Sequence, residues 1–110
     1  MHTRVVEITS KPEKARELCR TIEDQVLPML KKQQGFIDEL VMASDSDPNR
    51  VVAQSLWKTR DDAQRYVNEQ YETVLKIVKP LLERPPDVRT FNVHISTAHR
   101  WTTAKAEKVA

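Results

Sequence analysis

Residues 50–67, RVVAQSLWKTRDDAQRYV, join an extended segment directly to a helical one. Their first half, RVVAQSLWK over residues 50–58, is rich in β-branched and large apolar residues, which favours a strand. Thr59 and Asp62 then supply the hydroxyl and the carboxylate that are typical of a helix N-terminus. The stretch therefore predicts a strand that is followed at once by a helix.

The sequence on either side extends both elements. Residues 36–44, FIDELVMAS, also have the composition of a strand, and the intervening DSDPN contains turn-forming Asp, Pro and Asn, so we expect a hairpin. Downstream, a short helix over 63–69 is expected to continue or restart at Gln70, and Pro80 should bend or shorten it. Its apolar stripe consists of Tyr71, Val74, Leu75, Val78, Leu81 and Leu82.

The N-terminal part begins with the same alternation of strand and helix. Residues 3–9, TRVVEIT, predict a strand with Val6 and Ile8 on one face. Ser10 and Glu13 have the spacing of a capping box, so we expect a helix to begin there.

The first helix is amphipathic and interrupted. Pro28 lies inside its apolar pattern, so a kink or restart is expected near residues 24–27. The helix should end by Gln34, because Gly35 follows and glycine readily adopts the positive φ of a helix stop. The apolar stripe consists of Ala15, Leu18, Cys19, Ile22, Val26 and Met29.

A last strand is predicted over residues 88–97, with Phe91, Val93 and Ile95 on its core face. The resulting order, strand, helix, strand, strand, helix, strand, is that of a split βαβ arrangement. We therefore expect a four-stranded antiparallel sheet with both helices on one face.

The length of 110 residues fits one compact domain. We assign residues 1–97 to this domain. Residues 98–110 are rich in alanine and lysine without an apolar period, so they are expected to form a tail that is mobile or docked on a partner subunit. Trp101 belongs to this tail.

Composition excludes several classes of function. Gly35 is the single glycine, whereas phosphate-binding and dinucleotide-binding loops need several. Cys19 is the single cysteine, which leaves neither an intramolecular disulfide nor a thiolate zinc cluster. The net charge of +2, with basic residues scattered along the chain, argues against a nucleic-acid partner.

Membrane and metal partners are not expected either. No stretch has the apolar length of a membrane span or of a secretory signal, so we expect a cytoplasmic protein. His2, His94 and His99 form no helical pair and are not accompanied by cysteine ligands, so no metal site is predicted.

The predicted arrangement leaves one face of the sheet without helices. Val5, Val51 and Ala53 are expected on this open face, where an apolar surface needs a cover. A second copy of the chain is the expected cover, which predicts a homodimer.

Three segments carry a family resemblance. GFIDELVM (35–42), VVAQSLWKTRDDAQRYV (51–67) and PDVRTFNVHI (86–95) stand where the antibiotic biosynthesis monooxygenase domain family has its corresponding segments. Over residues 3–97 the chain resembles that family. The resemblance implies a ferredoxin-like α+β fold of βαββαβ order, dimeric α+β barrels, and a small-molecule pocket between the sheet and the helices of each subunit.

The resemblance also implies site residues. Trp57 matches an indole that the related enzymes often place at the end of this strand. Tyr66 lies one to two helical turns further, where catalytic relatives have a His or a Tyr, so both are candidate catalytic residues. Tyr71, Phe91 and His94 are candidate substrate-binding residues. Each also has a structural interpretation, because aromatic side chains contribute heavily to burial and His94 can simply face solvent or an interface.

A haem cofactor is not expected. The haem-degrading branch of the family uses a histidine on this helix and an asparagine on the first strand, whereas this chain has Tyr66, Val67 and Asn68 on the helix and Glu7 on the strand. No other cofactor is expected.

Two functions follow from the resemblance. One is a cofactor-independent monooxygenase that acts on a small electron-rich aromatic or quinol substrate. The alternative is a non-catalytic dimeric protein of the same fold that binds a small molecule or serves a structural role.

Overall fold

A computed structural model of the chain describes residues 1–99 and contains one sheet of four antiparallel strands in the order β2-β3-β1-β4. The two hairpin strands lie on one side of β1 and the last strand on the other. The strands are β1 (His2–Thr9), β2 (Phe36–Ala43), β3 (Arg50–Trp57) and β4 (Asp87–Asn92).

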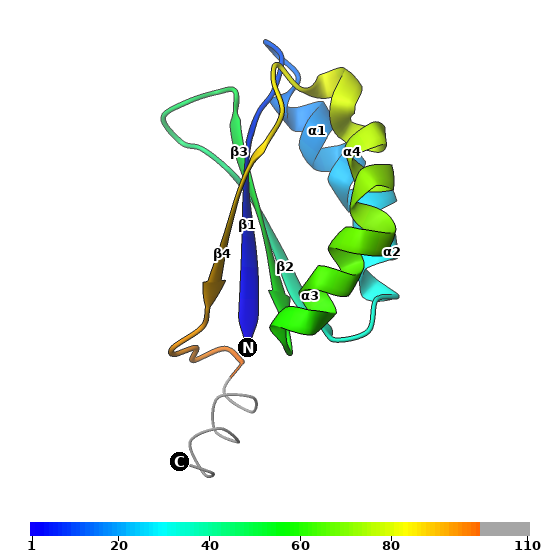
Figure 1. Cartoon of the computed structure of the whole chain (residues 1–110). Coiled ribbons are helices and arrows are strands. Elements are labelled where there is room, and N and C mark those ends of the chain that lie inside the picture. The colour runs from blue at the N-terminus through cyan, green and yellow to red at the C-terminus, as the bar shows by residue number, and fades with distance from the viewer. Residues whose placement is uncertain (100–110) are drawn as a thin grey trace, which may run out of the picture.

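Two helical arms cover one face of this sheet, and the other face is open (Figure 1). The first arm consists of α1 (Ala15–Thr21), the π-helical turn η1 (Ile22–Val26) and α2 (Leu27–Lys31). The second arm consists of α3 (Arg60–Tyr66), the π-helical turn η2 (Val67–Tyr71), α4 (Glu72–Val78) and the 3₁₀ turn η3 (Lys79–Leu81). The predicted ferredoxin-like α+β fold is confirmed. None of the helices in residues 1–99 has the length and apolarity to cross a membrane.

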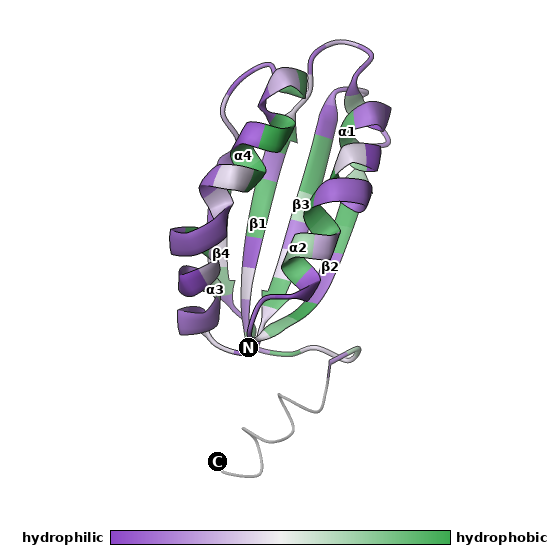
Figure 2. Cartoon of the chain, turned by 90° about the vertical axis from the view of Figure 1, so that its right-hand side faces the viewer, coloured by the Kyte–Doolittle hydropathy of each residue, from purple (hydrophilic) through white to green (hydrophobic). Residues whose placement is uncertain are grey.

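The core lies between the sheet and the two arms, and β1 and β3 beneath the helices carry stretches of green, the colour of apolar residues (Figure 2). The pairing register decides which side chains point there, since directly paired residues share a face. Val6 pairs with Ala53, and Ile8 pairs with Val51. The core consists of Ile8, Leu18, Ile22, Val26, Leu30, Val51, Trp57, Ala63, Tyr66, Val74, Val78 and Leu82.

The register corrects the predicted composition of the open face. Val51 and Ala53 were expected there, but they pair with Ile8 and Val6 and therefore face the helices. Val5 does lie on the open face, because it alternates with these residues along β1. Strands with apolar residues on both faces give no sequence signal for the choice of face. The open face instead carries exposed Leu40, Met42 and Phe91.

The start of the first helical arm also differs from the prediction. The capping box is wrong: Glu13 has a φ of 65°, and helix α1 begins at Ala15 with no side-chain cap. Ser10 forms a β-bridge with Leu82, and its hydroxyl donates to the Lys11 carbonyl. Ser10 therefore pairs with another extended segment, and its hydroxyl is not available to cap a helix.

The expected interruption at Pro28 is confirmed, and it takes the form of the π turn η1. Proline has no N–H to donate to the carbonyl four residues before it, so the regular hydrogen-bond pattern cannot run through this position. In the second arm, Thr59 caps α3 as predicted, because its Oγ1 accepts from the Asp62 amide at 3.1 Å.

Strand β4 is shorter than predicted and is not a core strand. It ends at Asn92, all six of its residues are exposed, and Phe91 is 52% exposed. Because β4 is an edge strand that neither helical arm covers, its apolar residues lack a buried face. Residues 93–99 then cross the end of the sheet, where His99 Nε2 lies 3.1 Å from Asp38 Oδ2 on β2 (Figure 2). Trp101 lies outside the described residues.

Gly35 ends the first arm with a φ of 80°, as expected of a helix stop. It has a second role that the sequence does not reveal: a Cβ at this position would overlap the side chain of Asp62 in the first turn of α3. The Gly35 carbonyl also accepts from the Lys58 amide at 2.8 Å. The single glycine therefore lets the loop before β2 approach the β3–α3 junction.

Replacing this glycine should destabilise the fold. We expect Gly35→Ala to lower the free energy of unfolding by at least ~1–2 kcal/mol, because alanine is strained at positive φ and its methyl group displaces Asp62. Urea denaturation followed by circular dichroism measures the effect. Gln34→Ala, at the exposed preceding position, is the control and should be close to neutral; equal midpoints for the two variants would contradict the predicted contact.

Candidate functional site

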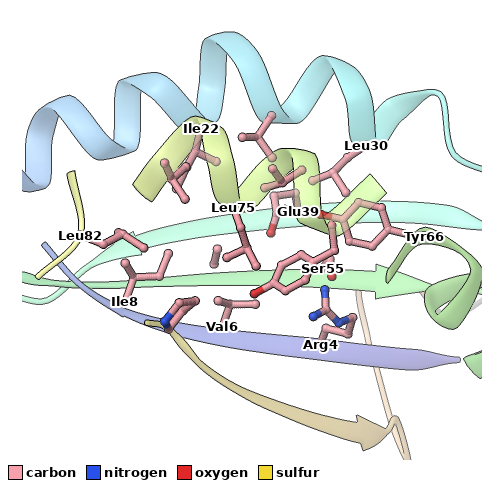
Figure 3. Close-up of a pocket in the computed structure, with 16 residues that line it drawn as sticks. Arg4, Val6, Ile8, Ile22, Leu30, Glu39, Ser55, Tyr66, Leu75 and Leu82 are labelled. Atoms are coloured by element: carbon pink, nitrogen blue, oxygen red, sulfur yellow. The ribbon is translucent and has the colours of Figure 1, made fainter. Parts of the chain in front are cut away.

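A cavity of about 50 Å³ lies between the sheet and the two helical arms. Its lining is polar at one end and apolar at the other (Figure 3). Arg4, Ser55 and Tyr66 gather at the polar end, and Ile8 and Leu82 lie at the apolar end. The space holds only a few water molecules and is far below the ~300–1,000 Å³ of typical ligand pockets. The cavity is therefore too narrow in this structure for a ligand of ordinary size.

The polar end is a single row across three strands. Ser55 on β3 pairs with Glu39 on β2 and with Arg4 on β1, so all three side chains project toward the helices. The neighbouring row, Val41, Ala53 and Val6, is apolar. Sheet register thus places a row with two charged side chains directly beside an apolar row.

Aromatic rings pack above this row. The Tyr66 ring stacks on Trp57 with ring centroids 5.2 Å apart, and Tyr71 meets Tyr66 edge to face at 6.2 Å. Trp57 is fully buried, and its Nε1 donates to Ser55 Oγ at 2.9 Å. Phe36 meets Trp57 edge to face, with ring centroids 5.6 Å apart. Trp57 therefore packs against one face of the Tyr66 ring.

Arg4 is a buried cation that the two tyrosines face. Its guanidinium carbon lies 4.5 Å from the Tyr71 ring centroid and 5.7 Å from that of Tyr66, which are cation–π distances. Arg4 itself is 5% exposed. No carboxylate in residues 1–99 forms an ion pair with it. The polar end of the cavity therefore holds an unneutralised positive charge.

Two further polar atoms are buried without a partner. Within the described part of the chain, neither Glu39 Oε1 nor the Tyr71 hydroxyl has a hydrogen-bond partner. Burial of a polar group without a hydrogen bond is unfavourable, and native structures contain few such atoms. Their presence beside one cavity marks it as a candidate functional site.

Burial also shifts the proton affinities of the site. Burial raises the pKa of Glu39 to about 8, against a lowering by the Arg4 charge and a further raising by Asp38. Burial raises the pKa of Tyr66 as well, with the Arg4 charge opposing the shift. Tyr66 is consequently a hydrogen-bond donor at any pH near neutrality, and Glu39 is a carboxyl group that can take up or release a proton near pH 8.

Both π turns supply side chains to the cavity. Ile22 and Val26 come from η1, and Tyr71 comes from η2. A π turn adds a residue to the helical turn and is frequent at functional sites, because it redirects side chains relative to a regular helix. Here it places the Tyr71 ring over the guanidinium of Arg4 in the polar row, at 4.5 Å.

The residues predicted from the sequence divide into two groups. Tyr66 and Tyr71 line the cavity, and Trp57 contacts Tyr66 without lining it. Phe91 and His94 lie elsewhere: both are exposed, and Phe91 pairs with Thr3, on the sheet face opposite to Arg4. Neither residue lines this cavity, because Phe91 lies on the open face of the sheet and His94 lies beyond the end of β4.

Sequence reasoning missed the two charged members of the site. Arg4 precedes Val6 and Ile8 at alternate positions, so period-two alternation alone places it on the core face. Glu39 lies at the same kind of position between apolar residues of β2. A charged residue in phase with the core face of a strand is the signal that could have identified both. In residues 1–99, no group of three or more His, Cys, Asp and Glu side chains is placed to hold a metal ion.

The raised pKa of Glu39 predicts how stability depends on pH. Between its unfolded value near 4.5 and about 8, the folded state keeps a proton that the unfolded state has lost, so stability falls as pH rises through this range. Glu39→Gln should remove this fall and leave the variant more stable than the parent at pH ~9, by several kcal/mol at most, since each pKa unit corresponds to ~1.4 kcal/mol. Thermal unfolding between pH ~5 and ~9 measures the difference. Asp45→Asn, on an exposed loop, is the control, and a Glu39→Gln curve parallel to that of the parent would refute the assignment.

Comparison with solved structures identifies the same fold in other proteins. A monooxygenase from Streptomyces coelicolor, solved with nanaomycin D, is 18% identical with a TM-score of 0.73, over 86% of this chain and 88% of that one. SnoaB, a cofactor-independent oxygenase from Streptomyces nogalater, is 16% identical with a TM-score of 0.74, over 87% and 95%. A protein of unknown function from Nitrosomonas europaea is also 16% identical with a TM-score of 0.74, over 87% and 91%. At these identities the similarity establishes the fold.

Comparison of the sequence with family models gives the more specific result. No curated protein matches the chain. The model described as antibiotic biosynthesis monooxygenase matches residues 1–73, which include β1, the first helical arm, the hairpin and the tyrosines of the cavity. The chain belongs to the antibiotic biosynthesis monooxygenase family.

Proposed function

We propose that the protein is a monooxygenase that oxidises a small electron-rich aromatic or quinol substrate without a bound cofactor. The observation that carries the proposal is the cavity between sheet and helices, in which an apolar wall meets a buried cation, two tyrosines and an unpaired carboxyl group. Family membership supports it. So do two neighbours of the same fold, one named as a monooxygenase in complex with nanaomycin D and the other as a cofactor-independent oxygenase.

The chemistry requires little of the protein. A substrate that loses a proton to form a stabilised carbanion can itself reduce dioxygen, so the pocket needs to bind the ring, exclude water and orient a few donors. The apolar end of the cavity supplies the first two requirements. The polar end supplies the donors.

Tyr66 is the proposed catalytic donor. Its ring lines the cavity, and its raised pKa keeps the phenol protonated, so that it can donate to a developing oxyanion or peroxide oxygen. Trp57 acts through Tyr66 and is a positioning residue, because it stacks on the Tyr66 ring and does not line the cavity.

Binding of a ring requires the cavity to open. The present volume of about 50 Å³ is too small for an aromatic substrate, so the lining side chains must move apart. The π turns η1 and η2 are the natural places for this motion, because their hydrogen bonds are less regular than those of the flanking helices.

Paired substitutions test the proposed site. Tyr66→Phe keeps nearly the whole volume and removes the donor, so it should lower the turnover rate about 100-fold with little change in melting temperature. Trp57→Phe leaves a cavity and should cost ~1–3 kcal/mol of stability. Oxygen uptake with a panel of quinols and anthrones, by protein free of metal and chromophore, measures turnover. Unchanged turnover in Tyr66→Phe would remove Tyr66 from the mechanism.

A specific observation also favours the alternative, a non-catalytic binding protein. The stack of Phe36, Trp57, Tyr66 and Tyr71 satisfies the packing needs of the core by itself, without a catalytic role. Binding of the same compounds without oxygen uptake would establish this second function.

We propose further that a second copy of the chain covers the open face of the sheet. This face carries Leu40, Met42 and Phe91 at 49%, 41% and 52% exposure, a clustering of apolar side chains that marks association surfaces. Both edge strands border it, so a partner can extend the contact beyond the face itself.

A charge on this face should separate the subunits. We expect the parent protein to sediment at twice the chain mass of 12.8 kDa, and Leu40→Lys with Met42→Lys to sediment as a single chain at micromolar concentration. Thr73→Lys, on the exposed side of α4, is the control and should leave the dimer intact. A parent protein that sediments as a single chain at that concentration would disprove the homodimer.

A further inference from the structure

The polar end of the cavity contains buried polar groups that have no partner within the described residues and that a ligand could bind. Arg4 has no carboxylate partner in residues 1–99, and the same part of the structure offers no hydrogen bond to Glu39 Oε1 or to the Tyr71 hydroxyl. An acceptor, a donor and a cation thus lie unpaired around one space. A ligand oxygen that carries both a proton and a potential negative charge matches all three.

The sheet sets the separation of these groups. Glu39 and Arg4 lie on β2 and β1, on either side of Ser55 on β3. Two strand spacings place their backbones ~10 Å apart. Both side chains are long and project to the same face, so an oxygen atom held above Ser55 lies within reach of a carboxylate on one side and a guanidinium on the other.

We propose that Glu39 is the general base that removes the proton from a phenolic or enolic hydroxyl of the substrate, and that Arg4 holds the resulting oxyanion. The assignment rests on the proposed monooxygenase function and deepens it, because it names the base, the anion site and the substrate class. The Tyr71 hydroxyl donates a hydrogen bond to the same oxyanion.

The proton balance of this step is simple. The O–H bond of the substrate breaks, its electron pair stays on the substrate oxygen, and the proton forms a new O–H bond on Glu39 Oε1. The charge lost from the carboxylate is gained by the oxyanion, which lies against Arg4. No net charge is therefore created inside the cavity, which keeps the desolvation cost low.

Glu39 also has a route for the proton to leave. Besides the inner cavity, Glu39 lines an outer groove between α1 and β2, together with Arg16, Arg20 and Val41. Its carboxyl group is therefore placed between the substrate space and the surface. A proton taken from the substrate can pass to solvent through this groove without crossing the apolar end of the cavity.

The pKa of Glu39 and that of a phenolic substrate are close enough for proton transfer between them. The pKa of Glu39, about 8, is much closer to that of a phenol, ~10, than an ordinary carboxyl group would be. A neighbouring cation lowers the pKa of an acid by ~1–3 units, so Arg4 closes the remaining gap for a hydroxyl bound beside it. The titratable and charged groups around Glu39 are Arg4 on β1, Asp38 on β2, Tyr66 on α3, Tyr71 on η2, Arg16, Cys19 and Arg20 on α1, and Glu23 on η1.

The test separates proton transfer from oxidation. 2-Naphthol and its methyl ether are titrated into the intact protein without oxygen, at pH ~9, between the pKa of Glu39 and the ~10 of a free aromatic hydroxyl. Naphthol should bind with the absorption of its anion and at least ~10-fold more tightly than the ether, since a charge-assisted hydrogen bond is lost with the ether. No proton should reach the buffer, because the bound oxyanion raises the pKa of Glu39 further and keeps the transferred proton on its carboxyl group.

Variants assign the two roles. Glu39→Gln should bind naphthol at least ~10-fold more weakly and release a proton for every anion that it binds. Arg4→Met should lose the preference for naphthol over the ether. Arg4→Lys keeps the positive charge and should retain the preference, so it shows whether a loss in Arg4→Met comes from the charge or from misfolding. Glu23→Gln, in the outer groove, is the matched control and should behave as the parent.

Each outcome decides a different claim. Equal affinity of the parent for naphthol and the ether, or Glu39→Gln behaving as the parent in both spectrum and proton release, overturns the assignment. Anion binding that depends on Glu39 and Arg4 supports it. Oxygen uptake is measured separately with the quinol panel, so its absence alongside anion binding rejects the proposed function and leaves the proton-transfer site standing.

Discussion

The register between β1 and β3 is the constraint on which the rest of the structure depends. It pairs Arg4 with Ser55, Val6 with Ala53 and Ile8 with Val51, and so fixes in one step the core, the cavity wall and the charged row. A slip of one residue would turn Arg4 to the open face and bring Val5 into the core. Val6 and Ile8 favour the observed register, because a slip of one residue would turn Ile8 out of the core and bring the charged Glu7 beneath the helical arms.

Burial of the Arg4 charge is unusual because its neutralisation is incomplete. The faces of Tyr66 and Tyr71 provide part of the compensation, and the carboxyl group of Glu39 remains largely protonated at neutral pH because burial disfavours its charge. The two groups thus avoid the desolvation cost of a fully charged buried pair. A site that is strained in this way by its own polar groups gains stability when a ligand supplies the missing partners.

The helical layer is adapted to the same row. Each arm contains a π turn that contributes to the cavity, and the second of these turns places Tyr71 beside Arg4. Gly35, at the end of the first arm, lies against Asp62 in the first turn of the second arm. Tyr66 belongs to the same helix as Asp62, so its position depends on how the two helical arms pack against each other.

The sequence by itself determined the element order and the fold class, and its resemblance to the family pointed to the aromatic residues Trp57, Tyr66 and Tyr71. Period-two and helical patterns, the Thr59 cap and the turn residues are local signals, and local signals suffice to place strands, helices and tyrosines along the chain. Only the tertiary structure decided that Ser10 pairs with Leu82, that β4 is an exposed edge strand, and that Arg4 and Glu39 line the same cavity. These outcomes depend on strand order and register between residues far apart in sequence, and pairing across such distances leaves no periodic trace in either segment alone.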